Sequence, residues 1–357
     1  MTNATTQQPP EQVLIEPICD RERVAIIFNP VSGTEDGATR RSDLEALARS
    51  AGITCPFVET DKDRGAGPLA EQAVADGMER VIVSGGDGSV TESAHALTGT
   101  ATSLAVVPGG TGNILALNLR IPTNREAAMR LALTGEARPT DVGRANGTAF
   151  LVAAGMGLDA RVMRDADREL KNRYGKLAYF IAVARNLGQR HARYRITIDG
   201  VRRQRYGQMV MIANLGRITG GLELVPGSDP DDGKLEVAIL RTRRLRDFGL
   251  IALRALLGRT RGDDLLEILQ GRDIVVETHP SQPVQIDGDE IGRVERLEVH
   301  VEQGALLLVR PARDKEATPM VDFAVAAGRR SWLPVAVGAT GVGLGLWIFR
   351  QWRVAHR

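Results

Sequence analysis

The stretch Val81–Glu92 reads VIVSGGDGSVTE and places three glycines around a single aspartate, directly after an apolar run. The run Val81–Val83 is typical of a central strand, and the pattern from Ser89 to Leu97 indicates the start of a helix. A glycine-rich turn between a strand and a helix brings bare backbone N–H groups against a negatively charged ligand. The stretch therefore predicts a turn that binds phosphate.

The N-terminal half of the chain alternates strand-like and helix-like segments around this turn. Helix-like stretches lie at Asp43–Ala51, Leu69–Gly77 and Thr91–Leu97. Alternation of this kind predicts a parallel sheet with helices on both faces. The apolar runs of strand length are Val24–Phe28, Ile53–Val58, Val81–Val83 and Leu104–Val107.

Three of the predicted strands end in unusual loops. Ligands of parallel sheets bind at the carboxyl ends of the strands, so we expect these loops to converge on one site. The second loop is not a Walker A loop, because no Gly-Lys-Ser/Thr follows its glycines, and it lacks the spacing of a Rossmann fingerprint. The loops are NPVSG (Asn29–Gly33), SGGDGSVTE (Ser84–Glu92) and PGGTGN (Pro108–Asn113).

After Asp141 the pattern changes to alternating strand-like stretches separated by Gly, Pro and Asp turns, which predicts a mostly antiparallel β domain. Inserted helices are expected near Lys171–Leu187 and Leu245–Leu257. The predicted strands are Ala149–Ala153, Tyr194–Ile198, Met209–Ala213, Leu235–Leu240, Asp273–Glu277 and Leu297–Val301.

The three loops, in this order, resemble those of the diacylglycerol kinase catalytic-domain superfamily, which includes bacterial lipid kinases, sphingosine kinases and ceramide kinases. The resemblance covers roughly Arg21 to Arg310. It implies a three-layer α/β nucleotide-binding domain at residues 21–140 and a β-sandwich lipid-binding domain at 141–310. Residues 311–330 are then expected to form a linker or to return to the first domain.

The resemblance also implies which residues contact ATP, and elementary chemistry supports Asp87 as a ligand of Mg²⁺, since a carboxylate and a phosphate repel each other. Glu92 is expected to be a partner of that site or a charge at a helix N-terminus. The implied ATP-contacting residues are Asn29, Pro30, Ser32, Gly33, Thr60, Gly86, Asp87, Gly88, Ser89, Thr91, Glu92, Thr111 and Asn113.

The turn QIDGDEIG (Gln285–Gly292) matches the family's proton acceptor. Asp287 and Asp289 straddle a glycine, so both carboxylates are within reach of one cleft, and the sequence does not decide between them. The second acid is Asp289 where relatives commonly have Glu, which is a shorter arm. The alternative is a plain Asp-Gly hairpin turn.

The stretch SDPDDGKLEV (Ser228–Val237) matches a segment where relatives place a structural Mg²⁺. The ligands carried over are Asp229, Asp232 and the backbone carbonyl of Lys234, and oxygen ligands at this spacing suit a hard cation. A solvated turn before a strand is the alternative.

The 46 Lys+Arg and 44 Asp+Glu residues nearly balance, which argues against a polyanion binder as a whole. Two cysteines are too few for a disulfide framework or a structural zinc site. Two arginine-rich stretches, 185–205 and 241–246, lack an aromatic platform for nucleic acid and instead favour an anionic membrane surface. A homodimer is left open.

The two ends of the chain differ sharply. Residues 1–20 are mostly polar and are expected to be disordered. Trp332–Phe349 is a run of 18 uncharged residues flanked by arginines, which predicts a transmembrane helix over residues 331–352. A single-pass anchor is therefore expected, with the catalytic domains in the cytoplasm because ATP is there.

The function expected from these features is that of a lipid kinase using ATP and Mg²⁺, which transfers the γ-phosphoryl group to a hydroxyl of a membrane lipid such as a diacylglycerol or a sphingoid lipid. An NAD kinase shares the GGDG turn, but the PGGTGN loop and the hydrophobic tail argue against it. A catalytically silent, membrane-anchored binding protein would be expected to lack Asp87, Glu92, Thr111 or Asp287, and all four are present.

Overall fold

The computed structural model describes residues 23–312 except 54–56, 166–181, 183–185, 187–190, 219–222, 243–244, 257–259 and 261–263. The expected disorder at 1–20, the transmembrane helix at 331–352, nearly all of the segment 311–330 and most of the helix near Lys171–Leu187 lie outside these residues. Within the described part, every helix is too short or too polar to traverse a lipid bilayer.

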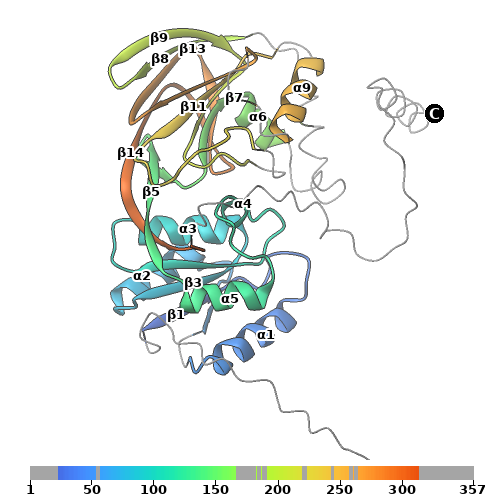
Figure 1. Cartoon of the computed structure of the whole chain (residues 1–357), viewed down its shortest axis with the longest axis vertical. Helices are drawn as coiled ribbons and strands as arrows, with labels where there is room; N and C mark the ends of the chain where they lie inside the picture. The colour runs from blue at the N-terminus through green and yellow to red at the C-terminus, as the bar shows by residue number, and fades with distance from the viewer. Residues whose placement is uncertain are drawn as a thin grey trace, which may run out of the picture. The chain divides into compact units, whose positions relative to one another are not determined.

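The N-terminal part is a three-layer α/β fold, as predicted (Figure 1). Four strands pair in parallel in the order β2-β1-β3-β4. They are β1 (Val24–Phe28), β2 (Phe57–Glu59), β3 (Arg80–Gly85) and β4 (Ser103–Pro108). The helices are α1 (Gly37–Ser50), α2 (Ala66–Ala75), α3 (Asp87–Leu97), α4 (Ile114–Asn118) and α5 (Arg125–Thr134).

Alternating side chains of these strands build two cores, one on each face of the sheet. Ile26 and Ile82 face the core shared with α1 and α5, whereas Ile27 and Val81 face the core shared with α2 and α3. Because both faces are covered, all residues of β1 and β3 are buried. Rigid buried strands fix the positions of the loops that follow them.

The C-terminal part is a β-sandwich, which also agrees with the prediction. Its two layers enclose a core of residues such as Tyr194, Ile212 and Val276, and α6 and α9 cover a second core on the outer face of β7, β10 and β11. The elements are β5 (Ala137–Ala145), β6 (Thr148–Phe150), β7 (Ala153–Gly157), α6 (Leu158–Asp165), β8 (Ala192–Ile198), β9 (Val201–Gly207), β10 (Met209–Ala213), β11 (Leu235–Leu240), α9 (Leu245–Leu256), β12 (Leu266–Gly271), β13 (Asp273–Ile286) and β14 (Asp289–Val309).

The two parts share one continuous sheet, because β14 spans both (Figure 1). This strand pairs with β13 and β5 and then reaches β4, where Leu308 lies beside Leu104 in parallel. The chain thus returns to the first domain before residue 311, within β14. The expected domain boundary at residue 140 falls inside β5.

The strand predicted at Ala149–Ala153 is interrupted. β6 ends at Phe150 and β7 begins at Ala153, so Leu151 and Val152 lie between the two strands. Their N–H groups are therefore not committed to a regular ladder, which matters for the site described next.

Candidate active site

The three predicted loops meet at the carboxyl ends of β1, β3 and β4, and glycines make the approach possible. Gly33 has φ +78°, and a Cβ added there would lie 2.3 Å from the carbonyl oxygen of Gly109. A Cβ on Gly110 would lie 2.6 Å from the Cα of Gly86. Any side chain at these positions would push the loops apart.

Hydrogen bonds hold the first loop against the second. The side-chain amide of Asn29 donates to Ser89 Oγ over 2.8 Å, and the N–H of Val31 donates to Asn29 Oδ1 over 3.1 Å. The Arg40 guanidinium donates to the carbonyls of Asn29 and Ser32 and lies 4.8 Å from the ring centroid of Phe28. Asn29, Ser32 and Ser89 therefore shape the loops.

Asp87 lies in the first turn of α3, at a helix start that carries no side-chain cap, because the N-cap residue is Gly86. Its Oδ1 accepts the N–H of Ile114 over 2.6 Å, which ties the second loop to the third. Burial raises the pKa of Asp87, and backbone N–H groups, chiefly that of Ile114, oppose the rise. A half-buried carboxylate beside an uncapped helix N-terminus is a place where a cation and a phosphate can bind together.

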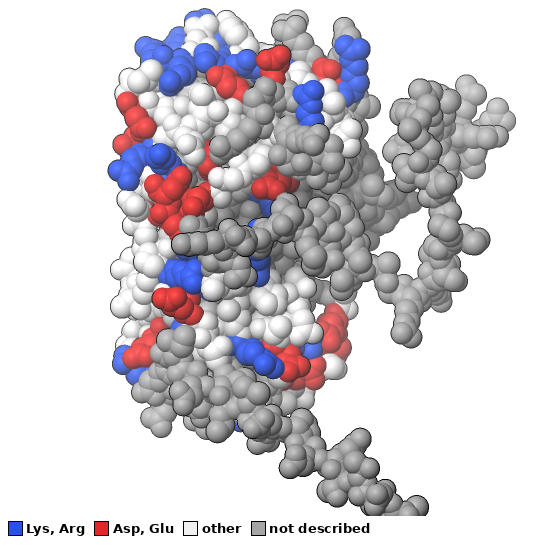
Figure 2. Space-filling view, in the orientation of Figure 1, with Lys and Arg blue, Asp and Glu red and all other residues white. Residues whose placement is uncertain are grey.

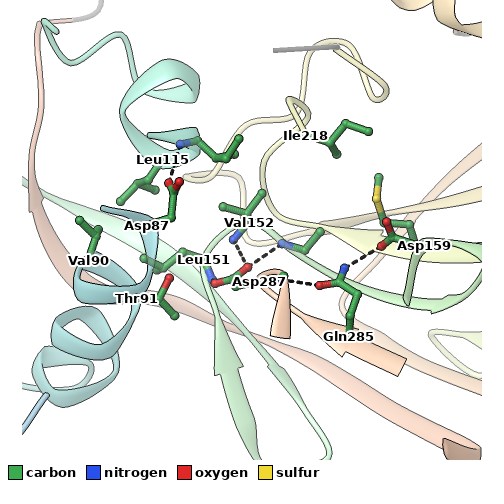
Figure 3. Close-up of a pocket in the computed structure, with 14 residues that line it drawn as sticks. Asp87, Val90, Thr91, Leu115, Leu151, Val152, Asp159, Ile218, Gln285 and Asp287 are labelled. Carbon is green, nitrogen blue, oxygen red and sulfur yellow. Dashed lines mark hydrogen bonds between the residues drawn. The ribbon is translucent and has the colours of Figure 1, made fainter. Parts of the chain in front are cut away.

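The backbone between β6 and β7 binds the carboxylate of Asp287. Its Oδ2 accepts the N–H of Leu151 over 2.8 Å, and its Oδ1 accepts those of Val152 (2.9 Å) and Ala153 (3.0 Å) (Figure 3). Burial raises the pKa of Asp287 although these three bonds lower it. The residue has φ +47°, so the following turn is tight.

Asp87 and Asp287 line the same pocket although they come from different domains (Figure 3). Thr91 also lines it, whereas much of the remaining wall is apolar. The apolar lining residues are Val90, Ile114, Leu115, Leu151, Val152, Ala153, Met211 and Ile218.

A third carboxylate in this pocket, Asp159, was not predicted from the sequence. It lies at the start of α6, and its Oδ2 accepts the side-chain N–H of Gln285 over 2.6 Å. Burial raises the pKa of Asp159, and the bond from Gln285 lowers it. The signal available in the sequence was weak: an aspartate two residues after Gly157, at the end of a buried strand.

A second cleft lies on the other side of the third loop. Thr111 and Asn113 line it, and Ile114, the residue after Asn113, lines the first pocket. Arg125, which pairs with Glu35 and Asp43, makes one wall. The remaining lining residues are Gly33, Thr34, Glu35, Arg40, Pro108, Gly109, Gly110, Thr123 and Asn124.

Family comparison agrees with this two-part architecture. Residues 23–145 match the model of the diacylglycerol kinase catalytic domain, and residues 152–310 match the YegS C-terminal NAD kinase beta sandwich-like domain. The chain belongs to the diacylglycerol kinase family. It is a lipid kinase, a phosphotransferase, and as a kinase it uses ATP.

Two relatives and one solved structure illustrate the similarity. A diacylglycerol kinase of Bacillus subtilis is 30% identical over 276 residues, which are 75% of this chain and 90% of the relative. A probable lipid kinase YegS-like of Pseudomonas aeruginosa is 31% identical over 308 residues (83% and 99%). The crystal structure of a putative diacylglycerol kinase from Bacillus anthracis has a TM-score of 0.72 at 26% identity and covers 81% of this chain and 97% of its own.

Several predicted site residues lie away from both cavities of this lipid kinase. Glu92 Oε2 accepts the N–H groups of Ala66 (2.8 Å) and Gly67 (3.3 Å), so it caps α2, whose own N-cap residue is a glycine. Thr60 is buried, and its N–H donates to the carbonyl of Phe28 over 2.9 Å. Pro30, Gly88 and the exposed Asp289 line neither cavity.

The turn that is predicted to hold a structural Mg²⁺ forms hydrogen bonds within itself. Asp229 Oδ1 accepts the N–H of Asp231 over 3.1 Å, and Asp232 Oδ1 accepts that of Lys234 over 2.9 Å. In the part of the chain that the structure describes, no three His, Cys, Asp or Glu side chains are placed to hold a metal ion. The predicted ligand set contains only two carboxylates, and its third ligand is a backbone carbonyl. The absence of a cluster of three side chains among the described residues therefore does not test the site at Asp229, Asp232 and Lys234, which stays a prediction.

Proposed function

We propose that this lipid kinase transfers the γ-phosphoryl group of ATP, with Mg²⁺, to a hydroxyl of a membrane lipid such as a diacylglycerol or a sphingoid lipid. The observation that carries the proposal is the pocket that Asp87 and Asp287 line together with mostly apolar side chains. Charged groups at one point and apolar lining around it suit the end of a lipid that presents a hydroxyl.

Asp87 fits a role in holding Mg²⁺. A carboxylate has about four acceptor sites, and Oδ1 of Asp87 uses one of its own for the N–H of Ile114, the strongest of its backbone contacts. The N-terminus of α3 carries no side-chain cap, and the glycine at position 86 lets a phosphate approach the backbone N–H groups of the first turn. Mg²⁺ held by Asp87 would supply positive charge that neutralises the phosphates.

Asp287 fits the role of proton acceptor for the lipid hydroxyl. Three backbone N–H bonds fix its carboxylate in one orientation, and burial makes it more basic than an exposed aspartate. Asp159 places a further carboxylate on the same wall. The cleft lined by Thr111 and Asn113 is the proposed nucleotide site, since Asn113 directly precedes Ile114, which lines the pocket of Asp87 and Asp287.

The direct test is to incubate the purified full-length protein with γ-labelled ATP, NAD and vesicles that contain diacylglycerol, a sphingoid base or neither. Label in a lipid supports the proposal and names the acceptor class. Label transferred only to NAD would support the NAD kinase alternative. Retained nucleotide binding with no transfer to any of these acceptors would support the silent-protein alternative.

We further propose that the β8–β9 hairpin binds an anionic membrane surface. Arg193 and Arg195 are exposed on β8, and Arg202 is exposed on β9 (Figure 2 shows the blue cluster at the top of this face). α9, toward the same end of the domain (Figure 1), exposes Leu250 (40%) and Leu253 (53%), one turn apart. Cationic and apolar side chains at one end of a domain are typical of interfacial binding.

The arginines of this hairpin are expected to matter for vesicle binding. Charge reversal by Arg193→Glu with Arg195→Glu should weaken binding to anionic vesicles about tenfold or more, since each cation near the surface contributes about 1 kcal/mol. Sedimentation with anionic and neutral vesicles measures this. Arg49→Glu with Arg130→Glu makes the same charge change on α1 and α5 and is expected to leave binding nearly unchanged. Equal losses in the two double variants would contradict the proposal.

The segment 331–352 is proposed to tether the kinase to the bilayer, since its 18 uncharged residues span about 27 Å as a helix. Truncation before Ser331 is expected to move the protein to the soluble fraction while it still phosphorylates detergent-dispersed lipid. On vesicles its rate should fall, because the tether raises the local substrate concentration. Release of the full-length protein from membranes by carbonate would contradict a spanning helix.

A further inference from the structure

Gln285 joins two parts of the proposed site. It is a buried residue near the end of β13, and its side-chain N–H donates to Asp159 Oδ2 over 2.6 Å. Its Oε1 accepts the backbone N–H of Gly288, also over 2.6 Å (Figure 3). One amide therefore contacts the Asp159 carboxylate on one side and the turn that carries Asp287 on the other.

The chemistry of the partners fixes the orientation of this amide. Rotation by 180° would point the amide oxygen at a carboxylate oxygen and the amide nitrogen at an N–H group, so both contacts would become repulsive. Gln285 is thus held in one state by an acceptor and a donor. Neither a carboxylate nor an apolar side chain of the same size satisfies both partners at neutral pH.

The neighbouring strand is built to allow this bridge. Gln285 lies opposite Gly155 in the β13–β7 register. A Cβ on Gly155 would lie 1.9 Å from Asp159 Oδ2. Only a glycine at position 155 therefore lets the Asp159 carboxylate reach across β7 to Gln285.

We propose that Gln285 is a positioning residue that locks Asp159 and the Asp287 turn into a single arrangement, so that the two carboxylates act as one unit. This inference rests on the proposed function, in which Asp287 accepts the proton of the lipid hydroxyl. Gln285 favours the charged form of Asp159 by donating to it, and keeps the Asp287 backbone in place by accepting from Gly288.

The decisive variant is Gln285→Glu, which preserves size but sets a second carboxylate against Asp159. At pH 8 kcat is expected to fall by about one to two orders of magnitude, because misplacing a reacting group by about 1 Å costs up to a hundredfold. The KM for ATP should change little, since the nucleotide cleft does not include this residue. The loss should shrink toward pH 6, where a shared proton restores a donor between the two carboxyls.

Gln285→Met tests the same bridge, but its loss of activity is expected to persist at low pH. It removes both bonds and leaves Asp159 without its donor, so the pKa of Asp159 should rise further, and activity should not recover at low pH. The matched control is Gln282→Glu, a buried glutamine on the same strand whose Oε1 faces Arg161 rather than Asp159. Its kcat and pH profile are expected to stay close to those of the unmodified protein.

Thermal unfolding without substrates separates this inference from the proposed function. The midpoint of Gln285→Glu should drop most at high pH and recover toward pH 6, because a raised carboxyl pKa in the folded state makes stability fall as pH rises. That pattern holds whichever acceptor the kinase uses. A pH-independent loss of stability, or a kcat loss equal at every pH in both Gln285 variants, would overturn the proposal. A kinase with no lipid acceptor but with this unfolding pattern would overturn only the proposed function.

Discussion

Replacement of Asp87 by asparagine is expected to lower kcat by about two to three orders of magnitude while the free protein unfolds at an unchanged or higher temperature. The activity falls because a neutral amide binds Mg²⁺ far more weakly, and loss of one such electrostatic contact typically costs that much. Stability is kept because Asn Oδ1 still accepts the N–H of Ile114, and the variant no longer buries a charge.

The difference in melting temperature between Asp87→Asn and the unmodified protein is expected to depend on pH. Burial raises the pKa of Asp87 in the folded state, so ionising it costs stability, and this cost appears as pH rises above the pKa of the unfolded chain. The Asp87→Asn variant lacks the cost. Its advantage in melting temperature over the unmodified protein should therefore grow from acid to neutral pH.

Asp36 supplies the control for Asp87. Its carboxylate is exposed and caps α1 by accepting the N–H of Thr39 over 2.9 Å, a bond that lowers its pKa. Asparagine is an equally good N-cap residue, so Asp36→Asn should change neither kcat nor the melting temperature appreciably. Activity of Asp87→Asn within a few-fold of the unmodified protein would remove Asp87 from the proposed metal site.

The glycine loops were predictable because their signal is local. Each follows an apolar run of strand length, so sequence order alone places Asn29, Asp87 and Asn113 at one edge of a sheet. The strand ends and the order of elements followed from the same pattern. What such a pattern lacks is information on contacts between residues that are distant in the chain.

The contacts that the sequence did not predict join residues that are far apart in the chain. Gln285 meets Asp159 across 126 positions, and Asp287 meets Leu151 across 136. Glu92 was expected near the nucleotide, but it caps α2, whose start lies 26 positions earlier. Hydrophobic periodicity predicts which face of an element is buried, but it does not predict which polar group from a distant part of the chain contacts that element.

Polar strands account for most of the missed secondary structure. β9 reads VRRQRYG and exposes most of its side chains, and among the described strands it pairs with β8 alone. β5 contains Pro139 and Asp141, and the second of these turns inward to accept the N–H groups of Gly233 (2.6 Å) and Gly304 (2.8 Å). β13 is longer than predicted because its pairing with β14 resumes at Gln282 after a register shift.

Asp287→Asn is expected to differ from Asp87→Asn in stability, although both lose activity. Both oxygens of Asp287 accept backbone N–H groups, so one of them must become an NH₂ group in the variant. That group would face the N–H of Leu151 or those of Val152 and Ala153. A buried donor without an acceptor costs about 1–3 kcal/mol, so the melting temperature should fall.

The kinetic consequence separates Asp287 from Asp289, which the sequence left undecided. Asp287 lines the pocket, whereas Asp289 is exposed at the start of β14 and lines neither cavity. Loss of a general base lowers turnover by about 10²- to 10⁴-fold, so Asp287→Asn should reduce kcat by that factor with a near-normal KM for ATP. Asp289→Asn should retain kcat within a few-fold and keep the melting temperature. If Asp289→Asn were the variant that loses turnover, the proton acceptor would be the exposed aspartate, and the three N–H bonds of Asp287 would serve only to fix the turn between β13 and β14.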